Sequence, residues 1–87
     1  MTLNQFVVAF RKHVQARGIH PQLGENREIR IGEDCPLSWM AKTFPCSVAS
    51  SAEVLGLTPA NAWRIANAAD FGRGKLRRQL LKAAGIK

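Results

Sequence analysis

Hydrophobic residues recur along this chain mostly at helical spacing. Apolar side chains at positions 3, 6, 7, 10 and 14 mark one face of a helix that we expect to run to about Arg17. Thr2 and Gln5 have the form of a capping box at its start, and Gly18 followed by Ile19 is a typical helix end. Two of the four Phe residues lie on this inner face, so the helix should supply a large part of the core.

Residues 20–34 do not follow a helical pattern. Pro21, Gly24, Asn26 and Gly32 interrupt any helix, whereas residues 27–31 alternate polar and apolar as a short strand does. We expect residues 20–23 to pair with this strand as a hairpin that leans on the helices, because an isolated hairpin is marginal. Four of the six acidic residues fall here, where they either keep this side away from DNA or pair with the basic C-terminus.

Further helical faces follow. Pro36 fits a first helical position, apolar residues at 37, 40, 41 and 44 (Phe44) form a face, and Pro45 is expected to end that helix. The next helix points residues 48, 52 and 55 inward and has three possible caps, Ser47, Ser50 and Ser51. After a joint at residues 71–74, a last helix covers Lys75 to Ala84. Its expected inward residues are Leu76, Leu80, Ala83 and Ala84.

Residues 52–69 carry the most distinctive pattern, which is a helix end, a turn and a second helix. Gly56 can take the left-handed conformation that ends a helix, and Leu57 can fold back onto the last turn. Thr58 and Pro59 fit the cap and the first position of the next helix. The inward residues of that helix, at i, i+3, i+4 and i+7, are Ala62, Ile65, Ala66 and Ala69. The opposite side offers Asn61, Arg64 and Asn67.

This stretch resembles a helix-turn-helix DNA-reading unit over about twenty residues. The matching positions are Ala52, Leu55, Gly56, Leu57, Ala62 and Ile65, whereas Ser51 stands where an apolar residue is usual. The resemblance implies that the second helix lies in the major groove with its early residues at the base edges. In this chain those residues are Thr58, Ala60, Asn61, Trp63, Arg64 and Asn67. The alternative is an ordinary helical hairpin that serves the core.

Together these patterns predict a mostly α fold, a compact bundle of about five short helices with a helix-turn-helix-like pair and one short β-hairpin or extended segment. Residues 1–87 should form a single helical domain, because a chain of this length has room for one core. No apolar run approaches the roughly twenty residues that span a bilayer, and polar residues interrupt the N-terminus. We therefore expect a cytoplasmic protein, in a bacterial cell or phage-infected host, with no membrane partner.

Positive charge is concentrated in the last quarter of the chain. The balance is +1 over residues 1–63 and +6 over residues 64–87. Besides Arg64, the cations of this segment are Arg73, Lys75, Arg77, Arg78, Lys82 and Lys87. We expect Lys75, Arg77, Arg78 and Lys82 on the outer surface of the last helix. Solvated faces usually mix both signs, whereas no acid follows Asp70, so this cluster favours contact with phosphates or with an acidic protein.

Two kinds of side chain bear on base reading. Arg64 and Asn67 are the types that bond guanine and adenine edges, with the alternatives that Asn67 is merely solvated and that Arg64 pairs with Asp70. Trp39 and Trp63 are expected to be half-buried packing residues rather than stacking platforms, although a Trp63 exposed beside Arg64 would favour stacking or partner anchoring.

Catalytic and metal chemistry find little support. Cys35, Cys46, His13 and His20 lack the short separations of a structural zinc site, and we expect both cysteines to be reduced thiols. The sequence has no Gly-rich phosphate loop, paired-carboxylate site or metal motif. We expect no cofactor, no metal and no enzymatic activity; a catalytic thiol protein is the least favoured hypothesis.

The leading hypothesis is a small DNA-binding transcriptional regulator of bacterial or phage type. We expect a homodimer, because one such helix pair offers little contact area and two half-sites are the usual remedy. The alternative is a small phage inhibitor, anti-CRISPR-like or a host-takeover factor, that binds an acidic protein or ribonucleoprotein surface. Two Trp residues and the imperfect match to the reading helix favour that alternative.

Overall fold

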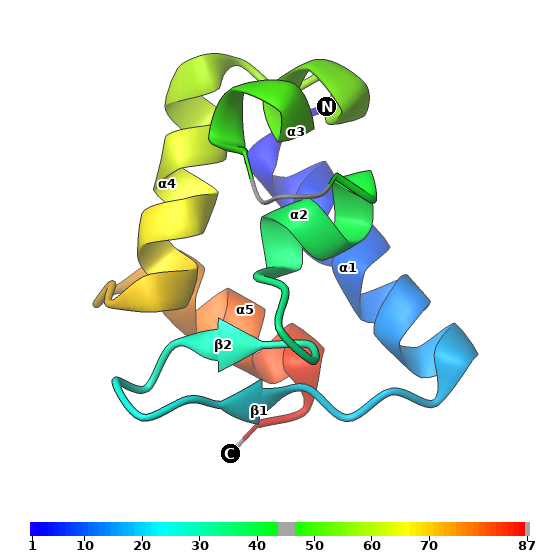
Figure 1. Ribbon diagram of the computed structural model, residues 1–87, viewed down its shortest axis with the longest axis vertical. Helices are drawn as coiled ribbons and strands as arrows, with labels where there is room; N and C mark the ends of the chain where they lie inside the picture. Colours follow the sequence, from blue (N-terminus) through cyan, green and yellow to red (C-terminus); the bar gives the residue numbers. More distant parts are fainter. Residues whose placement is uncertain (44–46, 87) are drawn as a thin grey trace.

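The computed structural model describes residues 1–43 and 47–86. These residues form five helices and one two-stranded sheet (Figure 1). In chain order they are α1 (Leu3–Arg17), β1 (Gln22–Leu23), β2 (Ile29–Arg30), α2 (Pro36–Ala41), α3 (Val48–Leu55), α4 (Pro59–Asp70) and α5 (Lys75–Ala84). The predicted mostly α bundle with a short hairpin is confirmed. The expectations for Phe44, Pro45, Cys46 and Lys87 lie outside the described residues.

Helix α1 begins and ends where its sequence predicts. The Thr2 hydroxyl accepts a hydrogen bond from the Gln5 amide at 3.1 Å, and the Gln5 side chain accepts one from the Thr2 amide at 2.8 Å. Gly18 then adopts the left-handed conformation, with φ at 60°, and ends the helix. The buried residues of α1 are Phe6, Phe10 and Val14, so this helix provides the aromatic part of the core.

Strands β1 and β2 form the predicted hairpin. Leu23 pairs with Ile29 and Gln22 with Arg30 in antiparallel register. The hairpin crosses the end of the molecule where α5 and the C-terminal end of α4 meet (Figure 1). Ile29 is fully buried, which is how this short sheet gains the support that it needs.

Helix α2 is shorter than expected. Pro36 occupies its first turn as predicted, but the helix ends at Ala41, well before Pro45. Lys42 adopts the left-handed conformation, with φ at 57°, and the Thr43 amide donates back to the Ser38 carbonyl at 3.2 Å. The expected helix end was therefore wrong, because a local left-handed cap acts before the proline.

The start of α3 settles the choice among three serines. The Ser47 hydroxyl accepts a hydrogen bond from the Ser50 amide at 3.3 Å, so Ser47 is the cap. Ser51 is fully buried, and its hydroxyl is 2.8 Å from that of Thr43. Ser51, which stands where the helix-turn-helix pattern usually has an apolar residue, is thus buried with a hydrogen-bond partner.

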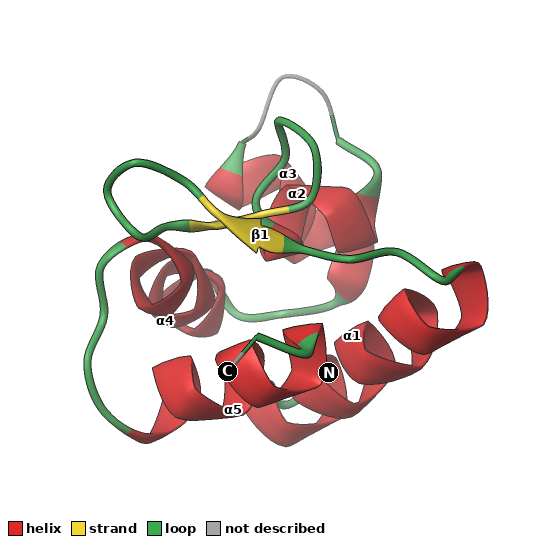
Figure 2. Cartoon of the chain, turned by 90° about the horizontal axis from the view of Figure 1, so that it is seen from below, coloured by secondary structure: helices red, strands yellow, loops and turns green. Residues whose placement is uncertain are grey.

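The helices pack in two groups around one core. Helices α2, α3 and α4 contact one another, while α5 packs against both α1 and α4 (Figure 2). The largest fully buried apolar side chains are Phe6, Phe10, Ile29, Leu37, Ile65 and Leu80. Over residues 1–43 and 47–86, no helix has both the length and the apolar character that crossing a bilayer requires.

Candidate nucleic-acid interface

The corner between α3 and α4 is built by three consecutive residues. Gly56, with φ at 66°, ends α3, and the amide of the buried Leu57 donates back to the Ala52 carbonyl at 2.9 Å. The Thr58 hydroxyl accepts a hydrogen bond from the Asn61 amide at 3.1 Å. This contact caps α4, so the hydroxyl of a predicted base-reading residue is already engaged in the helix start.

Helix α4 separates a buried face from an exposed one. As predicted, its buried residues include Ala62, Ile65, Ala66 and Ala69, and Ala68 joins them. The exposed residues that follow Pro59 in this helix define what we call the outer face: Ala60, Trp63, Arg64 and Asn67. Asn61 is only half-exposed, so it lies at the edge of this face rather than on it.

The two tryptophans behave differently. Trp39 is half-buried: it packs edge-on against Phe10 with ring centroids 5.9 Å apart, and the Arg17 guanidinium lies 5.6 Å from its ring. Trp63, in contrast, is 56% exposed. The expected packing role is wrong for Trp63, because a helical step of about 100° turns it away from the buried Ala62.

Basic side chains line the neighbouring segment. Lys75, Arg78 and Lys82 are exposed at i, i+3 and i+7 of α5, and Arg73 is exposed in the loop before it. We call these four residues the basic row. Helix α5 packs beside the C-terminal end of α4 (Figures 1 and 2), so the basic row and the outer face belong to adjoining helices.

Arg77 does not belong to the basic row. Its side chain is only 9% exposed, and its guanidinium donates to three backbone carbonyls. These are the carbonyls of Ala68 and Ala69, each at 2.9 Å, and that of Arg27 at 2.6 Å. The expected place on the outer surface is wrong, because Arg77 precedes Leu80 by three positions and Ala84 by seven and so shares their inward row. Applying the helical period to charged residues as well would have found it.

The acidic hairpin does not neutralise the basic row. Among the described residues, the one ion pair joins Arg30 Nε to Glu28 Oε1 at 3.5 Å, within the hairpin. Arg64 and Asp70 form no such pair in this part of the chain. Hydrogen bonds from the backbone amides of Glu28 and Asn26, with smaller help from Arg30, hold the pKa of the Glu28 carboxyl below its ordinary value despite partial desolvation.

Within the two described ranges, no three His, Cys, Asp or Glu side chains come together in a way that would hold a metal ion. No protein-family model, curated protein or solved structure matches the chain. Inference of function therefore starts from the outer face of α4 and the basic row.

Proposed function

We propose that the protein binds duplex DNA, with α3 and α4 acting as a helix-turn-helix and α4 in the major groove. The observation that carries this proposal is the outer face of α4. Arg64 and Asn67 are exposed one turn apart on a helix that begins directly after the Gly56 corner. Their side chains can form paired hydrogen bonds with the edges of guanine and adenine.

Electrostatics support the same partner. The outer face carries no acidic residue, and the adjoining basic row adds four cations. Each phosphate that such a side chain neutralises releases counterions and steepens the salt dependence of binding by about 0.9 log units per log unit of salt. The basic row would thus hold the DNA backbone while the outer face reads bases.

The size of the molecule suits binding as a homodimer. One copy measures 29 × 27 × 24 Å along its principal axes. Dimeric helix-turn-helix proteins read half-sites one DNA turn apart, about 34 Å, which is comparable to the width of one copy. We therefore propose a two-fold site with two related half-sites.

Selection of binding sites from a random duplex library tests the proposal, with Arg64→Ala as the variant and Arg11→Ala as its matched control. Arg11 is exposed on α1, so its removal takes the same charge from another helix. We expect Arg64→Ala to lower the preference for the selected site over random duplex by about tenfold, because one bidentate Arg–guanine contact contributes about 1–3 kcal/mol of discrimination. Arg11→Ala should leave this ratio unchanged.

Random duplex that competes as well as the selected site would contradict the proposal. That outcome would favour the second candidate, a small phage inhibitor of anti-CRISPR or host-takeover type that binds a protein or ribonucleoprotein. One observation favours this candidate: Trp63 is 56% and Phe71 is 74% exposed, and exposed aromatic residues beside an arginine are typical of binding hot spots. Binding that survives nuclease treatment but is lost in Trp63→Ala would identify it.

A further inference from the structure

A cavity of about 380 Å³ lies between the hairpin loop and the connection from α4 to α5. It is lined by Asn26, Arg27, Phe71, Gly72, Arg73 and Arg77. Three of these six residues are arginines and none is acidic. Arg27 lies 50 positions before Arg77, so the fold brings it beside the arginines at the start of α5 and gathers positive charge at this place.

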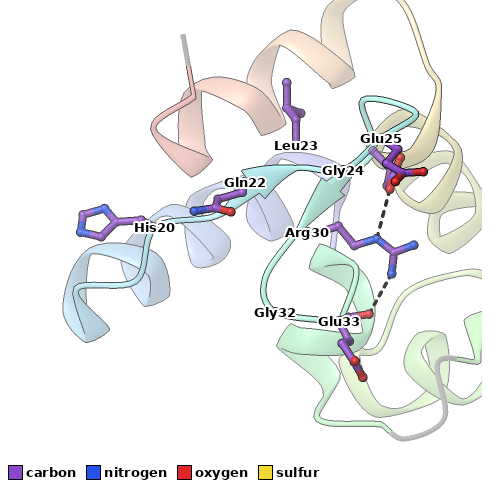
Figure 3. A pocket seen from close by; sticks show the side chains of 9 residues that line it. His20, Gln22, Leu23, Gly24, Glu25, Arg30, Gly32 and Glu33 are labelled. Carbon is purple, nitrogen blue, oxygen red and sulfur yellow. Dashed lines mark hydrogen bonds and ion pairs between the residues drawn. The ribbon is translucent and has the colours of Figure 1, made fainter.

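A second cavity beside the same hairpin shows the opposite arrangement. It has a volume of about 620 Å³, and Glu25, Glu28 and Glu33 line it together with Arg30 (Figure 3). There the Arg30 guanidinium pairs with the Glu28 carboxylate and donates to the Glu33 carbonyl at 2.9 Å. The Glu28 carboxylate thus neutralises the positive charge of Arg30 inside this second cavity. The first cavity, which we call the arginine cavity, has no carboxylate in its lining. Like charges gathered around one concave site favour an anion as the missing partner.

Arg77 is already oriented for such a partner. Its hydrogen bonds to the carbonyls of Ala68, Ala69 and Arg27 hold the guanidinium in one position. A guanidinium has more N–H donors than these three contacts use. Because the Arg77 side chain is already held in place, an anion can accept hydrogen bonds from the remaining N–H groups at little further cost in side-chain entropy.

Arg27 occupies a position that disfavours its residue type. It ends the three-residue loop of the hairpin, where its amide donates to the Gly24 carbonyl at 3.0 Å, and its φ is 64°. Hairpins with loops of this length usually place Gly or Asn at this left-handed position, because a side chain there is strained. An arginine at a strained position that lines a cavity indicates a use for its side chain.

The third arginine follows a tight approach of the chain. A Cβ added to Gly72 would lie 2.6 Å from the Ala68 Cα, so glycine lets the connection pass close to the end of α4. Arg73 comes next and is exposed at the cavity. The N-terminus of α5, whose N-cap residue Gly74 provides no side-chain cap, adds a weaker attraction for negative charge.

We infer that this cavity binds one phosphate group, as a monoester or diester, through the guanidinium groups of Arg27, Arg73 and Arg77. Planar guanidinium groups match the geometry of phosphate oxygens and bind them with paired hydrogen bonds. The phosphate belongs either to a free nucleotide or to the backbone of bound DNA. The site itself does not depend on sequence reading by α4, because none of the residues that line the cavity belongs to the outer face.

Titration of the full chain with inorganic phosphate, and separately with adenosine monophosphate, tests the site at constant ionic strength. Nuclear magnetic resonance should show saturable shifts of the Gly72 amide and of the arginine side-chain N–H signals of the cavity. Arg73→Gln should weaken phosphate binding by about tenfold, the effect of losing one charge-assisted contact. Arg11→Gln, which removes an exposed arginine from α1, should leave the affinity unchanged.

Arg27→Gly separates binding from folding. Glycine relieves the strain of the left-handed position, so the thermal unfolding temperature should stay the same or rise, while phosphate affinity falls by about tenfold. Unchanged affinity in Arg27→Gly would overturn the inference. Shifts that do not saturate, or equal losses in Arg73→Gln and Arg11→Gln, would overturn it as well.

A short duplex distinguishes the two sources of the phosphate. If the DNA backbone fills the cavity, duplex displaces bound inorganic phosphate, and Arg27→Gly, which changes no residue of the basic row, weakens duplex and phosphate binding together. If a free ester fills it, both ligands bind at once and Arg27→Gly leaves duplex affinity unchanged. Either result supports the site, and a failed Arg64→Ala experiment would count against DNA reading alone.

Discussion

The two ends of α4 are fixed in different ways. At its N-terminal end, the amides of Gly56 and Leu57 and the hydroxyl of Thr58 make their hydrogen bonds to residues about one helical turn away. The one distant contact at this end joins the Met1 ammonium to the exposed Gly56 carbonyl at 2.8 Å. At its C-terminal end, the carbonyls of Ala68 and Ala69 are bound by Arg77, a side chain from the next helix that also reaches the hairpin. The turn and the cap at the first end are therefore encoded locally, whereas the Arg77 contact at the second end forms only when three separate segments have come together.

Arg77→Met should have the largest effect, because it removes the contact that joins these three segments. The change keeps an aliphatic side chain but leaves the Ala68, Ala69 and Arg27 carbonyls without their charged donor. We expect the free energy of unfolding to fall by about 2–4 kcal/mol, because these buried carbonyl groups lose hydrogen bonds to a charged donor. Urea unfolding followed by circular dichroism measures the loss.

Arg78→Met is the matched control for this change. Arg78 is the next residue on α5 and is exposed, so its replacement should change stability by no more than about 0.5 kcal/mol. Equal losses in the two variants would mean that the Arg77 hydrogen bonds do not hold the C-terminal end of α4.

Thr58→Ala probes the locally encoded end and should have a smaller effect. It removes the hydroxyl that accepts the Asn61 amide, and the loss of a helix cap costs about 1 kcal/mol. Ser50→Ala removes an exposed hydroxyl inside α3, where Ser47 is the cap, and should be close to neutral. Unfolding of both variants under identical conditions gives the difference; a Thr58→Ala loss no larger than that of Ser50→Ala would show that the cap contributes nothing.

The same difference explains what could be predicted from the sequence. Helix ends at Gly18, Gly56 and Gly85 were predictable because a glycine followed by an apolar residue acts locally, and all three adopt positive φ. Exposure of Arg64 and Asn67 followed from the helical period. Arg77 was misplaced because its partner Arg27 is 50 positions away, and its basic neighbours obscured its inward position. The arginine cavity depends on that contact, so composition alone did not reveal it.

Glu28→Gln should have the smallest effect on stability. Its pH dependence tests the hairpin loop, whose Arg27 carbonyl accepts a hydrogen bond from Arg77. Hydrogen bonds from the Glu28 and Asn26 amides favour the carboxylate, so the pKa of Glu28 is lower in the folded chain than in the unfolded chain. The stabilisation is therefore fully present above the unfolded pKa, about 4.3, and is lost as pH falls through the lower folded value.

Thermal unfolding between pH 7 and pH 3 should show the wild-type protein losing its advantage over Glu28→Gln as acid is added. Glu25→Gln, in the same loop, controls for the change in net charge; a gap between wild type and Glu28→Gln that stays constant down to the lowest pH would show that the amides do not favour the carboxylate.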